Sequence, residues 1–218
     1  MKKATKALKR ALSLTLVCLL MLSSSAFSLV KATGVEEPPA IDYTFDASGK
    51  QWGCEFGNYM DSYSRWQSFT MPENGTLQSA EVWLIKKPND AGIVNDLSAS
   101  IYEMQNGVPS VRIGETVIVK GEDVVNKGVT TIDLSAVGKL SADKQYALLL
   151  TTSPVADDWK PAYDWVSTPK TEATANEIAG KENGYGFAAE EVVGIMYLKV
   201  NYQKVEPKVI DQSFDASG

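Results

Sequence analysis

Hydrophobic and polar positions alternate along most of the chain between residues 41 and 203. A period of two places every second side chain on the same face of a strand. Within residues 77–86, for example, Ala80, Val82 and Leu84 share one face and Trp83 lies on the other. The same pattern, rich in Val, Ile, Thr and Tyr, predicts strands over residues 64–70, 77–86, 97–104, 116–120, 129–134, 145–152 and 194–202.

Turn-forming residues such as Asn106-Gly107 separate the predicted strands. Helical periodicity appears only over residues 170–181, which have little apolar face and predict no more than a short surface helix. Seven to nine strands without a strand–helix–strand rhythm predict an all-β fold, an antiparallel two-sheet β-sandwich. A closed barrel is the alternative that fits the same pattern.

The first 32 residues have the features of a secretory signal peptide. Five basic residues within positions 2–10 precede an apolar run over residues 12–22, which is too short for an ordinary membrane span. Small residues follow at 23–26, and a second cleavage site is available at 30–32. Lipidation of Cys18 is the competing interpretation, but Val17 is not the small residue that it requires. We therefore expect a secreted protein that carries no membrane-inserted segment after cleavage.

Removal of this segment leaves a strongly acidic chain. Residues 1–32 hold six of the 21 basic residues and none of the 27 acidic ones, so 15 basic residues remain and the net charge is −12. Binding to nucleic acid depends on basic residues that neutralise phosphates, so we expect no nucleic-acid partner. Anionic membrane surfaces are disfavoured for the same reason.

The chain of 218 residues has no His and two Cys, and Cys54 is the only Cys after residue 32. The lack of His excludes Ser-His-Asp and Cys-His triads as well as His-ligated zinc. A lone Cys cannot form an intramolecular disulfide, and Cys54 between Trp52 and Phe56 is predicted to be a small buried residue. Stability must then come from an ordinary hydrophobic core.

A repeat defines the domain organisation. Residues 41–49 recur as residues 210–218 with seven of nine positions identical. The offset of 169 residues matches the length of one domain rather than that of a solenoid repeat. We therefore expect a signal peptide at 1–32, a linker at 33–40, a β-sandwich module at 41–203, a linker at 204–209 and, at 210–218, the first strand of a truncated second copy.

Several segments together resemble the jelly-roll (galactose-binding-like) β-sandwich modules of bacterial secreted and cell-surface proteins. These segments are residues 67–70, 75–84, 97–103, 107–109 and 140–150. The resemblance implies a jelly-roll topology and an accessory role in binding carbohydrate or in adhesion. It also allows a structural calcium ion but no other cofactor.

Residues 153–192 form a connection of 40 residues, longer than in similar modules, and loops of this length are usually functional or disordered. Aromatic faces and carboxylates, the two chemistries of sugar recognition, occur together within residues 157–165. The predicted ligand-binding residues are Asp158, Trp159, Tyr163, Asp164 and Trp165. The competing interpretation is that Tyr163 and Trp165 share one face of a strand and pack in the core.

Calcium binding needs six to eight oxygen ligands, and no EF-hand-like motif is present. The acidic residues near the early turns that could contribute are Asp42, Asp46, Asp61 and Glu73. The simpler interpretation is that they are solvated surface charge. Catalysis would need a carboxylate pair, but adjacent pairs such as Glu190 and Glu191 point to opposite faces of a strand.

We therefore expect a non-catalytic module that binds carbohydrate or cell-envelope glycan, with tandem copies adding avidity. A structural or adhesive repeat that contacts protein partners is the alternative, and a carboxylate-dependent enzyme acting on polysaccharide is a distant one.

Overall fold

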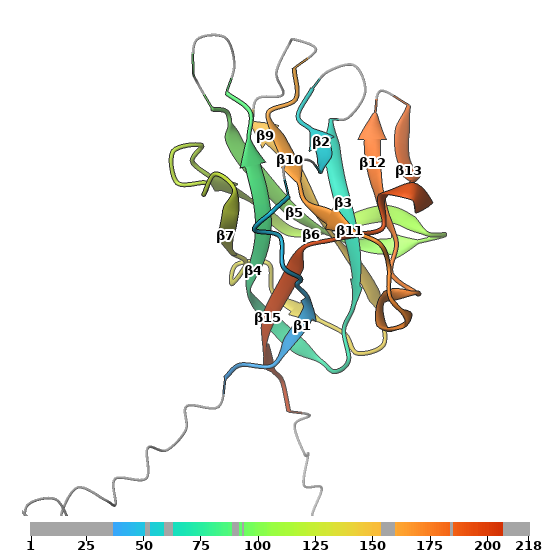
Figure 1. The fold of residues 1–218 in the computed structure, drawn as a ribbon. Helices are drawn as coiled ribbons and strands as arrows, with labels where there is room; N and C mark the ends of the chain where they lie inside the picture. Colours follow the sequence, from blue (N-terminus) through green and yellow to red (C-terminus); the bar gives the residue numbers. More distant parts are fainter. Residues whose placement is uncertain are drawn as a thin grey trace, which may run out of the picture. The chain divides into compact units, whose positions relative to one another are not determined.

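A computed structural model describes residues 37–50, 53–58, 63–88, 92, 94–153, 160–183 and 185–206. The predicted signal peptide, the repeat copy at 210–218, Asp158 and Trp159 lie outside these residues. The described chain is all-β, with antiparallel pairing throughout its strand ladders (Figure 1). In the part of the chain that is described, helix is confined to two single 3₁₀ turns, η1 (Glu172–Thr174) and η2 (Glu191–Val193).

The first sheet is built around the long strand β4 (Gly75–Lys86). One edge of β4 pairs with β15 (Leu198–Lys204) and, nearer its end, with β10 (Tyr163–Trp165). Its other edge pairs with β7 (Gly128–Asp133) and β8 (Lys139–Leu140). Two strands complete the sheet at its margins, β1 (Ala40–Tyr43) beside β15 and β2 (Cys54–Phe56) beside β10.

The second sheet has six strands in the order β13-β12-β3-β9-β5-β6. Their bounds are β13 Gly186–Ala189, β12 Ala179–Asn183, β3 Ser64–Thr70, β9 Gln145–Ser153, β5 Asp96–Gln105 and β6 Val108–Val119. A separate two-stranded ladder joins β11 (Ser167–Thr168) to β14 (Ile195–Met196). The two large sheets and their orientation can be followed in Figure 1.

The main hydrophobic core draws side chains from both large sheets. Leu77, Ala80, Val82 and Leu84 of β4 belong to the same buried cluster as the second-sheet residues Phe69, Leu97, Ile101, Leu148 and Leu150. One face of each sheet is thus removed from water by the other sheet, and this burial is the main source of stability in such a fold. The arrangement is consistent with the expected β-sandwich.

The outward faces of both sheets are also partly covered. Trp83 of β4 packs edge-on against Tyr197, and both belong to a small cluster closed by Phe45 and Ala47 from the segment after β1. On the second sheet, Trp66 is fully buried in another cluster. Hydrophobic side chains on the outer faces of the two sheets therefore pack against the segments that cover these faces.

The 40-residue connection at 153–192 contributes strands to both sheets. It contains β10, which lies between β4 and β2, and the β12–β13 hairpin, which extends the second sheet beside β3. Of the short helix expected over residues 170–181, the structure contains the single 3₁₀ turn η1, and residues 179–181 form the start of β12 instead. The strands expected over residues 64–70, 77–86, 97–104, 129–134 and 145–152 are confirmed, and the one expected over 116–120 belongs to β6, which begins earlier, at Val108. The strand expected over residues 194–202 is instead divided into β14 and β15, which belong to different ladders.

Candidate functional site

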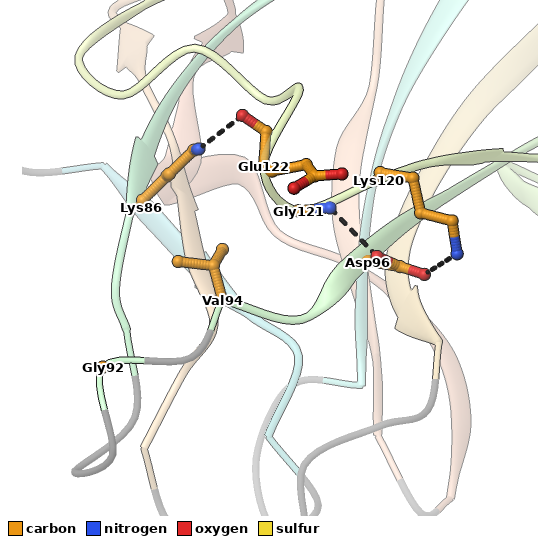
Figure 2. Close-up of a pocket in the computed structure, with 7 residues that line it drawn as sticks. All are labelled: Lys86, Gly92, Val94, Asp96, Lys120, Gly121 and Glu122. Atoms are coloured by element: carbon orange, nitrogen blue, oxygen red, sulfur yellow. Dashed lines mark hydrogen bonds and ion pairs between the residues drawn. The ribbon is translucent and has the colours of Figure 1, made fainter.

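A pocket of about 400 Å³ lies where β4 ends, β5 begins and β6 ends (Figure 2). Three segments of the chain form its wall. They contribute Lys86, then Gly92, Val94 and Asp96, then Lys120, Gly121 and Glu122. We call this site the loop-end pocket.

Asp96 holds two walls of the loop-end pocket together. One carboxylate oxygen accepts a hydrogen bond from the Gly121 amide at 3.0 Å, and the other pairs with Nζ of Lys120 at 2.8 Å. The hydrogen bond from Lys120, followed by that from Gly121, lowers the pKa of Asp96. Asp96 is therefore an ionised acceptor at neutral pH and is unsuited to donating a proton.

Gly121 is required because the backbone approaches closely at this point. A Cβ atom on Gly121 would lie 2.3 Å from the carbonyl oxygen of Val94, closer than two such atoms can approach. The glycine therefore lets the segment after β6 lie directly against the segment before β5.

Lys86 and Glu122 supply the remaining charges of the pocket. The Lys86 amide donates to Oδ1 of Asn126 at 2.9 Å, while its Nζ donates to the Glu122 carbonyl oxygen at 3.4 Å. Among the described residues, the Glu122 carboxylate has no hydrogen-bond or ion-pair partner. The pocket thus offers an ammonium donor and a carboxylate acceptor to a ligand (Figure 2).

Two of the predicted ligand-binding residues, Tyr163 and Trp165, are fully buried in the main core. The Tyr163 hydroxyl donates to the Asn95 carbonyl oxygen, and Nε1 of Trp165 donates to the Tyr197 carbonyl oxygen at 2.8 Å. Burial raises the pKa of Tyr163. Both rings therefore pack as the competing interpretation holds, and neither presents a face to a ligand.

Asp164 lies between these two residues and faces the opposite side of β10. It is 2% exposed, and its Oδ1 lies 3.0 Å from Nζ of Lys87, which also pairs with Glu55. Burial raises the pKa of Asp164, although the hydrogen bond from Lys87 opposes the shift. Burial lowers the pKa of Lys87, but the two carboxylate partners together outweigh this effect and leave it raised.

The described residues on either side of Asp158 and Trp159 lie beside the loop-end pocket. Ser153, which precedes the segment 154–159, pairs with Asp96 in the β5–β9 ladder. Ala162, which follows it, accepts a hydrogen bond from the Lys87 amide at 2.8 Å. The binding role of Asp158 and Trp159 stays a prediction. The contacts of Ser153 and Ala162, which flank them in sequence, are the reason to link this role with the loop-end pocket.

A second hollow, of about 680 Å³, lies between β2 and the end of β13. Arg65, one of its lining residues, donates to the Glu55 carbonyl oxygen at 2.9 Å and forms an ion pair with Glu190. Cys54 also lines this hollow, is 6% exposed, and has its pKa raised by burial. The guanidinium of Arg65 is already engaged by the Glu190 ion pair and by the hydrogen bond to Glu55. We therefore place the candidate ligand site at the loop-end pocket.

The acidic residues considered for calcium have other roles where they are described. Asp42 and Asp46 accept hydrogen bonds from the backbone amides two residues later, and Glu73 accepts from the Tyr202 hydroxyl. Asp61 lies outside the described residues. Within the described part of the chain, no group of three or more Cys, Asp or Glu side chains is arranged to hold a metal ion.

Comparisons with protein-family models, curated proteins and solved structures found no match to this chain. None of the helices in the described ranges has the length and apolarity needed to cross a membrane.

The sequence analysis missed the loop-end pocket because no local pattern marks it. Lys86, Asp96, Lys120 and Glu122 are separated by up to 36 positions. Pairing of β5 with β6 brings Asp96 and Lys120 together, and Lys86 reaches Glu122 from β4 of the other sheet. The one signal available was the turn-forming stretch 88–90 between two predicted strands.

Proposed function

We propose that the chain is a secreted, non-catalytic module of the jelly-roll (galactose-binding-like) type that binds carbohydrate or cell-envelope glycan at the loop-end pocket. The observation that carries the proposal is that an ammonium donor, Lys86, and a carboxylate acceptor, Glu122, both line one open pocket. Sugar hydroxyls both donate and accept, so they are suited to a pocket with both kinds of group.

The predicted contact of Trp159 with a sugar is compatible with the loop-end pocket. Trp159 is three residues from Ala162, and three extended residues span no more than about 11 Å. Ala162 is hydrogen-bonded to Lys87, the neighbour of the pocket residue Lys86. An indole ring near the pocket would add the flat apolar surface that stacks on a pyranose ring.

A non-catalytic role is supported by the state of the carboxylates. Asp96 is held ionised by two donors, so it is a poor general acid. Glu122 is exposed, and the other carboxylate among the lining residues, Asp96, is already held by Lys120 and the Gly121 amide. The pocket is thus better suited to binding than to cleaving a glycosidic bond.

A glycan array combined with pull-down on insoluble polysaccharides tests the proposal. We expect binding to at least one glycan, and a loss of about tenfold in affinity in each of Lys86→Met and Trp159→Ala. Lys139→Met is the matched control because Lys139 is exposed on β8, which pairs with the opposite end of β4.

The outcomes separate the alternatives. Binding that survives both substitutions would place the glycan site elsewhere. No binding to any glycan would favour the structural or adhesive repeat that contacts protein partners. Release of sugar from a polysaccharide would favour the enzyme. Mass spectrometry of the exported protein tests secretion, with loss of about 32 N-terminal residues as the expected result.

A further inference from the structure

Strand β1 and the residues after it are attached to the first sheet by three apolar side chains. Ile41 enters the main core, and Phe45 contacts the Tyr197 ring edge-on at 5.5 Å. Ala47 is 1% exposed in the small cluster with Ile85. The acceptor for this segment consists of the edge of β15 and the adjoining outer face of the first sheet, and we call it the β1 acceptor site.

Polar side chains within the same segment fix its turns. Asp42 accepts a hydrogen bond from the Thr44 amide at 2.8 Å. Asp46 accepts from both the amide and the hydroxyl of Ser48, at 3.0 and 2.7 Å. These bonds are local, so the conformation of the segment is specified by its own sequence.

The repeat at residues 210–218 contains each of these determinants. Ile210, Phe214 and Ala216 correspond to the three apolar anchors, and Asp211, Asp215 and Ser217 correspond to the turn-forming residues. The two differences are Gln212 in the place of Tyr43 and Ser213 in the place of Thr44. The second segment therefore lacks the contacts of Tyr43, whose ring packs against the main core and whose hydroxyl donates to Glu177.

We propose that the β1 acceptor site also binds residues 210–218 of a second copy of this chain, so that copies join by strand exchange. Exchanging a segment for a nearly identical one keeps almost all contacts, and domain swapping has a low cost for this reason. The resulting contact is head-to-tail, because residues 210–218 of one chain occupy the site that residues 41–49 occupy in another.

The geometry of β15 favours a second copy over the same chain as the donor. In β1, Ile41 lies opposite Val200. To place Ile210 opposite Val200, the same chain would have to reverse direction at Val205, the midpoint between them. Val205 still lies alongside the first sheet, with its amide donating to the Asn74 carbonyl oxygen at 2.9 Å. A reversal at this residue would therefore have to begin while Val205 is still held against Asn74.

The resident strand has two advantages over an incoming one. It is part of the same chain, and Tyr43 adds a hydrogen bond that Gln212 does not reproduce. We therefore expect β1 to occupy the site at low protein concentration and exchange to increase with concentration.

Cysteine trapping in the chain carrying Cys18→Ser and Cys54→Ser tests the proposal. Asp42 and Lys199 are direct cross-strand partners, so the pair Asp42→Cys/Lys199→Cys should form a disulfide within one chain and serves as the register control. Asp211 corresponds to Asp42 in the repeat. At high protein concentration, we expect Asp211→Cys/Lys199→Cys to give a disulfide-linked dimer.

The off-register pair Ser217→Cys/Lys199→Cys measures random collision, and we expect at least fivefold less dimer from it. Ile210→Asp should reduce the dimer to that background, and a synthetic peptide of residues 207–218 should compete with its formation. Equal yields from the two pairs would overturn the proposal. So would a disulfide between positions 211 and 199 of the same chain, because the donor would then be the chain itself.

Discussion

The hydroxyl of Tyr43 donates a hydrogen bond to Oε1 of Glu177 at 3.0 Å, across 134 positions of sequence. Glu177 is 5% exposed and also accepts hydrogen bonds from Ser68, Thr70 and Gln145 of the second sheet. Burial, followed by the negative charge of Glu177, raises the pKa of Tyr43. This carboxylate therefore joins β1, the 40-residue connection and the second sheet through neutral donors.

We expect Glu177→Ala to lower the free energy of unfolding by about 3 kcal/mol, because several buried donors lose a charged acceptor. Tyr43→Phe should cost about 1 kcal/mol, since it removes one of these bonds. Urea unfolding of both single variants and the double variant measures the coupling. The double variant should be less destabilised than the sum of the two, and strict additivity would contradict a direct bond.

Asp164 predicts a pH dependence of stability with a defined sign. Its pKa is raised above 3.8 in the folded protein, mainly by burial, so the folded state holds this proton more tightly than the unfolded chain. The contribution of Asp164 to stability therefore declines as the pH rises from 3.8 through the raised pKa. Asp164→Asn should remove this decline, which urea midpoints measured between pH 3.5 and about pH 7 can show.

Asp133 is the control with the opposite sign. It is exposed, and the hydrogen bonds from Ser135 lower its pKa. Its contribution is present above 3.8 and is lost as the pH falls through the lowered pKa. Stability differences of Asp164→Asn and Asp133→Asn that follow the same trend with pH would contradict the burial of Asp164.

Alternation predicted the long strands because each has one face in the main core. In β4, Ala80, Val82 and Leu84 point inward and are fully buried, as the period of two requires. Alternation failed in β10 because all three of its residues are buried, including Asp164 on the outer side. A strand of three residues that is covered on both faces has no period to detect, so the sequence left open whether Tyr163 and Trp165 bind a ligand from a loop or share one face of a strand.

The β12–β13 hairpin predicts a steric test of the second sheet. A Cβ atom on Gly180 would lie 2.1 Å from the Ala188 carbonyl oxygen and 2.4 Å from the Trp66 ring. We expect Gly180→Ala to destabilise the protein by about 1–3 kcal/mol, because backbone and a buried ring must both move. Gly49→Ala, where nothing lies within 4 Å, should stay within about 0.5 kcal/mol of the parent in thermal unfolding.

Part of the candidate site could be predicted from the sequence, and part could not. The pairing of carboxylates with aromatic residues directed attention to residues 157–165, and the described neighbours of that segment lie beside the loop-end pocket. The charges of the pocket itself, on Lys86, Lys120 and Glu122, have no spacing that distinguishes them from surface charge. They meet because the end of β4, the start of β5 and the end of β6 lie near one another.

Cys54 was expected to be a small buried residue, and the structure places it at 6% exposure with its thiol 3.6 Å from the Ser167 hydroxyl. Burial raises the pKa of the thiol, so little of the reactive thiolate is present at neutral pH. In a chain carrying Cys18→Ser, we expect native Cys54 to react with an aromatic disulfide reagent at least tenfold more slowly than in urea. Because the barrier is access, the native rate should rise with sub-denaturing urea and with Gly53→Ala, whose added Cβ would lie 2.6 Å from the Trp165 carbonyl oxygen. A native rate equal to the unfolded rate would show instead that the hollow between β2 and β13 admits the reagent to the sulfur.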